Sequence, residues 1–180
     1  MANPSKARGT AWESAIRDYL NERLGLYWPD WRERKRNGMT QWVNPMDPAN
    51  IKRQAQEGVK DVGDLHAWPF VLEAKDVKNP AVPTWMRQAR VEAFNAGFPV
   101  YVVCHKMRGR HVSHGWVYLD VRTFTAIRQA LGMSAREFWD WYGFCESKPL
   151  RGLDSSRWYW TTSMAHLAQI IGDVREVGRP

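Results

Sequence analysis

Two carboxylates and a lysine lie in and beside an apolar stretch of this chain, where charged side chains are costly to bury. Asp64 precedes a short Trp-Pro turn, and Glu73 and Lys75 belong to the run Phe-Val-Leu-Glu-Ala-Lys that follows it. Because side chains alternate along a strand, Glu73 and Lys75 share one face. A tight hairpin across the Trp-Pro turn would bring Asp64 beside Glu73.

These residue types are suited to the hydrolysis of a phosphodiester. Two neighbouring carboxylates repel each other unless a cation lies between them, and carboxylate oxygens with room for retained waters suit Mg²⁺. A protonated lysine is not a metal ligand, but it positions a water molecule or neutralises a phosphate oxygen. Metal and lysine together support in-line attack of water on a phosphodiester. A surface Glu-Lys ion pair is the alternative that the spacing alone also allows.

The elements that must position these residues follow from the apolar pattern. Helices are predicted where apolar residues recur every three or four positions, at 10–24, 84–96, 124–131, 134–142 and 161–174. Strands are predicted where apolar residues alternate or run on, at 59–66, 70–74, 98–104 and 116–124. This order predicts an α/β fold, with a mixed sheet flanked by helices in a core domain of residues 1–122. Residues 123–180 are predicted as a helical C-terminal extension packed on that core.

The segment GVKDVGDLHAWPFVLEAKDVK resembles the PD-(D/E)XK nuclease superfamily, and in particular the Holliday junction resolvase-like endonucleases of bacteriophages. The resemblance rests on the lead into Asp64, the Glu-Ala-Lys triplet and the later segment TWMRQARVEAFNAGFPVYVVCHKMRGR, and it covers residues 6–120. The chain departs from the superfamily name because Gly63, not proline, precedes Asp64. The resemblance implies a restriction-endonuclease-like fold, dependence on Mg²⁺ or Mn²⁺, and endonucleolytic cleavage of DNA in recombination and repair.

The resemblance also implies roles for individual residues. It makes Asp64, Glu73 and Glu13 metal ligands, and Lys75 the residue that orients or activates the water. The residues themselves offer a second interpretation of Glu13, because the order Thr-Ala-Trp-Glu that ends at Glu13 fits a T-x-x-E capping box.

Two further polar residues are less clearly assigned by the sequence. Gln88 shares a helix face with Trp85 and Glu92, so its amide either orders the Lys75 amine or a phosphate-bound water, or is an exposed polar group. Asp61 competes with Asp64 for the motif position. Asp64 is the better candidate because it comes closer to the turn, and Asp61 would face away from it in a strand.

Charge favours a polyanionic partner, because the net charge is +7 and the isoelectric point is near 9.6. Basic groups that contact phosphates give affinity without reading base sequence. The predicted DNA-binding residues come from segments that flank the predicted site: Arg34, Lys35, Arg36, Arg87, Lys106, Arg108 and Arg110. The expected partner is branched or duplex DNA. Because junction resolution needs two cuts related by symmetry, a two-fold homodimer is expected. The tryptophans of the C-terminal segment belong either to its interface or to the core: Trp139, Trp141, Trp158 and Trp160.

The two cysteines, Cys104 and Cys145, do not indicate a disulfide scaffold, because Cys104 lies in the apolar run PVYVVC. A zinc site that joins Cys104 to the nearby histidines is disfavoured by irregular spacing. No apolar run approaches the ~18 residues of a membrane span, and the N-terminus has no apolar leader. We therefore expect a cytoplasmic protein, in the cytoplasm of the host if a phage encodes it.

Two alternative functions remain open at the level of sequence. One is a nuclease of the same superfamily that acts on other DNA, as a nicking, flap or restriction-like enzyme. The other is a basic DNA-binding protein whose acidic cluster is only structural. Substrate choice depends on loops and oligomer geometry, so the sequence does not separate these possibilities.

Overall fold

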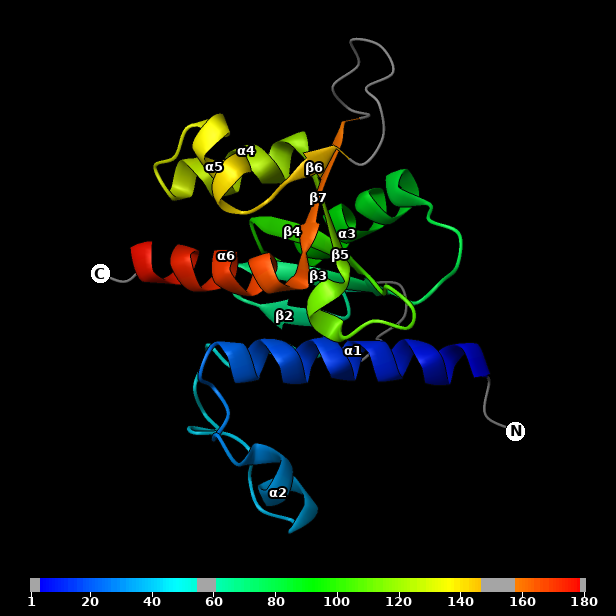
Figure 1. Ribbon diagram of the computed structural model, residues 1–180, viewed down its shortest axis with the longest axis vertical. Coiled ribbons are helices and arrows are strands. Elements are labelled where there is room, and N and C mark those ends of the chain that lie inside the picture. The colour runs from blue at the N-terminus through cyan, green and yellow to red at the C-terminus, as the bar shows by residue number, and fades with distance from the viewer. Residues whose placement is uncertain (1–3, 55–60, 147–157, 179–180) are drawn as a thin grey trace.

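A mixed β-sheet lies at the centre of the protein, with helices on both faces (Figure 1). The computed structural model describes residues 4–54, 61–146 and 158–178. The strands are β1 (Lys52–Arg53), β2 (Leu65–Ala67), β3 (Phe70–Lys75), β4 (Val100–His105), β5 (Trp116–Asp120), β6 (Cys145–Glu146) and β7 (Tyr159–Ser163). Their order across the seven-stranded sheet is β1-β2-β3-β4-β5-β7-β6. Strands β3 and β4 are parallel, and the other described pairs are antiparallel. The predicted α/β class is thus confirmed.

The helices are α1 (Pro4–Arg23), α2 (Trp31–Arg36), α3 (Val82–Ala96), α4 (Val121–Ala130), α5 (Ala135–Trp141) and α6 (Met164–Val177), with a 3₁₀ turn η2 (Val112–His114). No helix in the described part of the chain is both long enough and apolar enough to cross a membrane. Helix α3 makes the crossover between the parallel strands β3 and β4, as a parallel connection requires. A glycine with left-handed backbone, Gly97 at φ 71°, ends α3 where the sequence predicts a stop.

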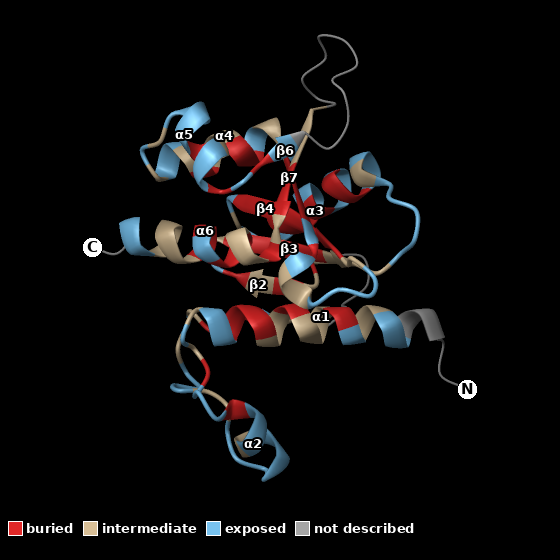
Figure 2. Ribbon diagram, in the orientation of Figure 1, coloured by how far each residue is buried: buried red, intermediate tan, exposed pale blue. Residues whose placement is uncertain are grey.

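Alternation along the strands divides the core between the two faces of the sheet. Val71 and Tyr101 pack with Trp85 and Ala89 under α3. Leu72 and the other residues that point to the opposite face of the sheet belong to a larger cluster with α1, α4, α5 and α6. The buried residues of these elements are red in Figure 2. Glu73 and Lys75 follow Val71 by two and four residues, so their side chains point to the same face as Val71, the face covered by α3.

Helix α1 is tied to the end of β4 by its apolar stripe. Trp12, Ile16 and Leu20 recur every four residues and are buried against the sheet. The indole Nε1 of Trp12 donates a hydrogen bond to the carbonyl of Cys104 at 2.9 Å. This bond places the middle of α1 beside the carboxyl ends of β3 and β4.

The segment after residue 122 is predicted to be helical, but it also contains the strands β6 and β7. Strand β7 pairs with β5 over five residue pairs, from Trp116↔Ser163 to Asp120↔Tyr159, and β6 pairs with β7. The sequence of β7, Tyr-Trp-Thr-Thr-Ser, is rich in aromatic and β-branched residues, which favour strands. The C-terminal segment therefore completes the central sheet, and its helices α4 and α6 share the core of the N-terminal part.

One other predicted strand is also corrected by the structure. The predicted strand 116–124 ends at Asp120, whose carboxylate accepts a hydrogen bond from the backbone N–H of Thr123 at 2.9 Å and begins α4. The basic segment that follows Tyr27 forms the helix α2. The carbonyls of Glu33, Arg34 and Lys35 accept hydrogen bonds from the backbone N–H groups of residues 37–39. The helix therefore ends at a turn around Gly38, which has a positive φ of 70°.

Candidate active site

A hairpin brings Asp64 to Glu73, as predicted. Strands β2 and β3 pair with Leu65 opposite Leu72, so Asp64 lies at the strand end beside Glu73. The Oδ2 atom of Asp64 accepts a hydrogen bond from the backbone N–H of Ala74 at 2.8 Å. The position of the Asp64 carboxylate is therefore determined by the backbone of the neighbouring strand and not by a flexible side chain.

A glycine shapes the chain immediately before Asp64. Gly63 has a φ of +87°, and a Cβ at this position would overlap Cγ1 of Val71 and lie 3.5 Å from Oε2 of Glu92. The N–H of Gly63 donates to Oδ1 of Asp61 at 3.1 Å, so Asp61 belongs to a local turn. The strand predicted for 59–66 therefore begins only at Leu65. Its first two residues lie outside the described part of the chain.

We expect Gly63→Ala to lower the free energy of unfolding by about 2–4 kcal/mol, from the strained φ together with the overlap at Val71. Gly38→Ala is the matched control, because Gly38 has a similar φ of +70° with nothing within 4 Å of a Cβ. We expect it to cost only about 1 kcal/mol. Urea unfolding of both variants checks this difference. Equal losses of unfolding free energy in the two variants would mean that Val71 does not lie close to Gly63.

Lys75 connects the carboxylates of the strand to helix α3. Its Nζ donates to Oε1 of Glu73 and, at 3.1 Å, to Oε1 of Gln88. The amide Nε2 of Gln88 in turn donates to Oε1 of Glu92 at 2.8 Å. The Gln88 amide thus contacts the Lys75 amine, as one of its two interpretations predicts, and Gln88 is also exposed, as the other predicts.

Burial strongly raises the pKa values of the two predicted metal-binding carboxyl groups. The pKa of Asp64 is raised to about 8 because the group is buried and Glu73 lies beside it, with a smaller contribution from the more distant charge of Glu13. The pKa of Glu73 is raised to about 7, mainly by burial and also by Glu92, and the charge of Lys75 partly opposes these effects. Without a cation, the site thus favours protonated over ionised carboxyl groups.

Glu92 is a third carboxyl group of this site, and it was not among the predicted site residues. It is only 2% exposed, and its Oε2 has no hydrogen-bond partner among the described residues. Burial raises its pKa, and its carboxyl group interacts with that of Glu73. The available signal was helical spacing, because Glu92 follows Gln88 by one turn on the inward face of α3.

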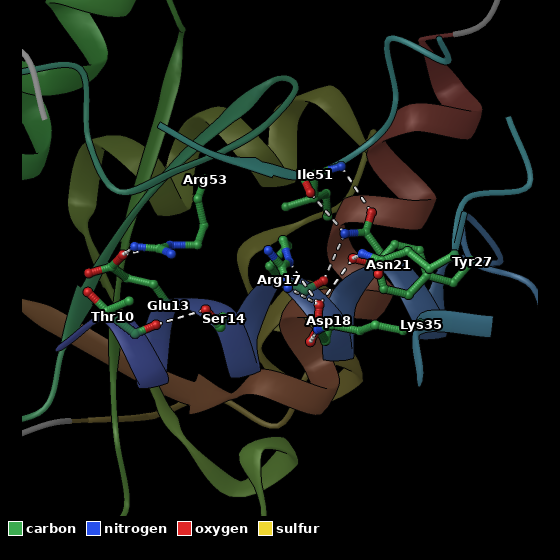
Figure 3. Close-up of polar contacts among 11 residues, drawn as sticks. Thr10, Glu13, Ser14, Arg17, Asp18, Asn21, Tyr27, Lys35, Ile51 and Arg53 are labelled. Carbon is green, nitrogen blue, oxygen red and sulfur yellow. Dashed lines mark hydrogen bonds and ion pairs between the residues drawn. The ribbon is translucent and has the colours of Figure 1, made fainter. Parts of the chain in front are cut away.

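Glu13 lies on the other side of the sheet, on helix α1, and is paired with an arginine (Figure 3). Both Nε and Nη2 of Arg53 donate to Oε2 of Glu13, at 2.8 and 2.5 Å. The capping-box interpretation is wrong, because α1 begins at Pro4 and Thr10 is therefore inside the helix. The backbone carbonyl of Thr10 accepts a hydrogen bond from the Ser14 hydroxyl at 2.9 Å instead.

Three of the predicted DNA-binding residues lie in the loop after β4, at the same end of the sheet. Lys106 and Arg108 both pair with the Asp76 carboxylate, at 2.8 and 3.2 Å, and the Asp76 side chain is only 4% exposed. Arg110 is exposed in the same loop, and Arg87 is exposed in the first turns of α3, next to Gln88. Two cations share one carboxylate here, so the loop keeps an excess of positive charge.

The remaining three predicted DNA-binding residues are not brought to the site. Arg34, Lys35 and Arg36 belong to α2, which follows the far end of α1 and extends away from the sheet (Figure 1). Arg34 pairs with Asp30 at 2.8 Å, and Lys35 lies 3.6 Å from Asp18. These basic groups therefore do not flank the carboxylate cluster, although the sequence order placed them between its elements.

The carboxylate pair is compatible with a hard divalent cation. Mg²⁺ is commonly bound by one or two carboxylates, with waters and substrate phosphates completing its shell, and Asp64 and Glu73 provide such a pair. Ionising two adjacent buried carboxyl groups is unfavourable unless a cation compensates them. No group of three or more His, Cys, Asp or Glu side chains in the described ranges is arranged to hold a metal ion, so the fit rests on these two residues.

Comparisons of the chain with protein-family models, with curated proteins and with solved structures found no match. The chemistry of the site must therefore be inferred from its own side chains. These comprise an adjacent pair of carboxyl groups, Glu73 buried and Asp64 half-buried, an amine held by a carboxylate and an amide, and a basic loop at the same end of the sheet.

Proposed function

We propose that this protein is a metal-dependent DNA endonuclease that hydrolyses phosphodiesters in branched DNA, including four-way junctions. The observation that carries the proposal is the joint position of three groups. Asp64 is held by the N–H of Ala74 beside Glu73, and Lys75 is held between Glu73 and Gln88. A surface ion pair would not require the burial of Glu73, which is 3% exposed, or a second contact from α3.

In this proposal, Asp64 and Glu73 bind Mg²⁺, with Mn²⁺ as a substitute. The bound cation supplies a Lewis acid for the phosphoryl oxygen and lowers the pKa of an attacking water. Lys75 donates a proton or hydrogen bond to the reacting phosphate or to the water, and Gln88 fixes the direction of its Nζ. The backbone N–H of Ala74 keeps Asp64 in one orientation without using a side chain that could move.

The basic loop after β4 supports DNA as the substrate. Lys106, Arg108 and Arg110 lie beyond the carboxyl end of β4, next to the end of β3 that carries Lys75. The side chain of Lys106 also lies 5.8 Å from the ring centroid of Trp12, so the loop is held against α1. We propose that these residues and Arg87 bind backbone phosphates on either side of the cleaved bond.

A two-fold homodimer is part of the proposal, because a junction resolvase makes two symmetric cuts. Among the tryptophans of the C-terminal segment, Trp160 stacks on Phe124 at 4.5 Å, while Trp141 is 65% exposed. Core packing thus accounts for Trp160, and Trp141 is available for a subunit contact. Light scattering of the purified protein, alone and with junction DNA, measures the oligomeric state.

The proposed activity is tested by incubating the protein with a labelled four-way junction and a linear duplex of the same sequence. Each substrate is combined with Mg²⁺, with Mn²⁺ or with EDTA. We expect cleavage of the junction in both metals and none in EDTA.

Each other outcome has a separate meaning. Equal cleavage of junction and duplex would support a nuclease of broader substrate range and reject the junction specialisation. DNA binding without metal-dependent cleavage of any substrate would reject the nuclease and leave a basic DNA-binding protein whose carboxyl cluster is structural.

A further inference from the structure

The pair formed by Glu13 and Arg53 is the feature of this region that the proposed chemistry does not use (Figure 3). Two donors of the guanidinium converge on one carboxylate oxygen, Oε2 of Glu13. The other oxygen, Oε1, is directed back along α1, 3.8 Å from the position of a Cβ on Gly9. One carboxylate oxygen of Glu13 is therefore occupied by Arg53, and the other lies toward the preceding turn of α1.

The sheet separates this pair from most of the carboxyl cluster. Arg53 lies opposite Leu65 in the β1–β2 ladder, and Leu65 packs in the cluster with α1. Residues directly opposite each other in a ladder point to the same face, so Arg53 shares the α1 face. Glu73 points to the α3 face, where it contacts Lys75 and interacts with the charge of Glu92.

Arg53 nevertheless lies close to Asp64 along the backbone. The N–H of the next residue, Gln54, donates to the carbonyl of Asp64 at 2.9 Å. Asp64 also experiences the charge of Glu13. The Glu13–Arg53 pair therefore borders the site at the strand end where Asp64 lies, on the opposite side from Lys75.

The exposure of the pair suits a phosphate ligand. The Arg53 side chain is 31% exposed, whereas that of Glu13 is 13% exposed. A guanidinium binds phosphate through a planar fork, and a carboxylate that holds it in place reduces the entropy lost on binding. Stability alone is a weak reason for such a pair, because a partly buried ion pair contributes little net free energy.

We infer that Arg53 binds a DNA backbone phosphate on the α1 side of Asp64, and that Glu13 positions Arg53 and does not ligate the metal. The inference rests on the proposed function for the identity of the substrate. It adds one phosphate contact to the site and removes one carboxylate from its metal shell. A DNA strand would thus pass the end of the sheet between Arg53 on one side and Lys75 on the other.

The test for Arg53 measures DNA binding in EDTA, so it does not depend on catalysis. The affinity for a labelled duplex is followed by fluorescence anisotropy between 50 and 200 mM KCl. We expect Arg53→Ala to weaken binding about tenfold and to reduce the slope of log K against log[KCl] by about 0.9, the value for one lost phosphate contact. Arg53→Lys should keep the slope and lose part of the affinity, because lysine retains the charge without the fork.

Two further variants separate phosphate binding from a structural role. Arg136→Ala, at a side chain 86% exposed on α5, makes the same charge change and should leave the slope unchanged. The double variant Glu13→Gln/Arg53→Gln leaves no unpaired charge. It should melt close to the wild-type temperature and still show the reduced slope. An Arg53→Ala slope equal to that of Arg136→Ala, or a wild-type slope in the double variant, would overturn the assignment of Arg53.

The role of Glu13 is tested by the binding of Mn²⁺ alone, followed by electron paramagnetic resonance of the free ion. We expect Glu13→Gln to bind Mn²⁺ within about threefold of wild type, while Asp64→Asn loses at least about tenfold. A loss in Glu13→Gln as large as that in Asp64→Asn would identify Glu13 as a ligand and overturn this part of the inference. If the wild-type protein neither bound Mn²⁺ nor cleaved DNA, the proposed nuclease and the assigned role of Glu13 would both be rejected. The salt dependence of DNA binding would still show whether Arg53 contacts a phosphate.

Discussion

Asp64→Asn is expected to lower the rate of metal-dependent DNA cleavage by about a thousandfold while the protein stays folded. In the wild type, the Ala74 N–H donates to Oδ2 of Asp64 at 2.8 Å, and asparagine keeps an oxygen that accepts this bond. The substitution removes the negative charge that a divalent cation needs. Single-turnover cleavage of a four-way junction with excess enzyme measures the chemical step directly. Circular dichroism of the same sample checks that the fold is retained.

The matched control for this substitution is Asp140→Asn on α5. Asp140 is an exposed carboxylate that pairs with Arg136 at 2.6 Å, on an element remote in sequence from the site residues. We expect its cleavage rate to equal that of wild type within experimental error. If Asp64→Asn cut as fast as Asp140→Asn, then Asp64 would not be a metal ligand, whatever the activity of the wild type.

Without divalent cations, the wild-type protein is expected to lose stability as the pH rises from 5 to 9, and Asp64→Asn is expected to remove most of that loss. The pKa of Asp64 rises from 3.8 to about 8, because burial and the neighbouring Glu73 disfavour its anion. Between these values the folded state binds more protons than the unfolded state. The free energy of unfolding therefore falls as the pH rises, and the loss is complete only above pH 8.

The size of this effect follows from the shift. Each pKa unit corresponds to about 1.4 kcal/mol, so ionising Asp64 in the folded state costs on the order of 5 kcal/mol. For a chain of this length, such a loss lowers the melting temperature by roughly 10–20 °C. Glu73, whose pKa is raised to about 7, adds a smaller loss in the same direction.

Thermal melts in EDTA at several pH values measure this dependence for wild type, Asp64→Asn and Asp140→Asn. The wild-type and Asp140→Asn profiles should be parallel, and the Asp64→Asn profile should be flatter and higher at pH 9. Added Mg²⁺ should raise the wild-type melting temperature at alkaline pH but not that of Asp64→Asn, because a ligand that binds only the folded state stabilises it. Superimposable profiles for all three proteins would contradict the assigned burial and coupling of Asp64.

Local residue patterns are sufficient to predict the strand that carries the chemistry. Alternation in Phe-Val-Leu-Glu-Ala-Lys places Glu73 and Lys75 on one face, and the Trp-Pro turn returns Asp64 to them, because strand geometry repeats every two residues. The uninterrupted apolar run before Lys106 likewise predicts the fully buried β4. Helical spacing orients Gln88 toward Lys75, and the amide makes that contact.

Contacts between distant segments depend on tertiary structure and are not predictable from such patterns. Arg53 meets Glu13 because a ladder places β1 beside β2 under α1, and nothing local to either residue marks the pair. The basic residues of α2 are near the site elements in sequence, but a turn directs that helix away. Strand β7 joins the sheet beside β5, although the five-residue segment alone is too short to show a decisive period.

The burial of the carboxyl groups is the clearest case of this division. The sequence specifies which residues are acidic, and the strand period specifies which of them are neighbours. Their affinity for protons depends on how much water the packing of α3 excludes from Asp64, Glu73 and Glu92, and this is a property of the assembled core. Residue types and short spacings therefore define the candidate chemistry, whereas the packing of helices on the sheet determines which charges reach it and how strongly they interact.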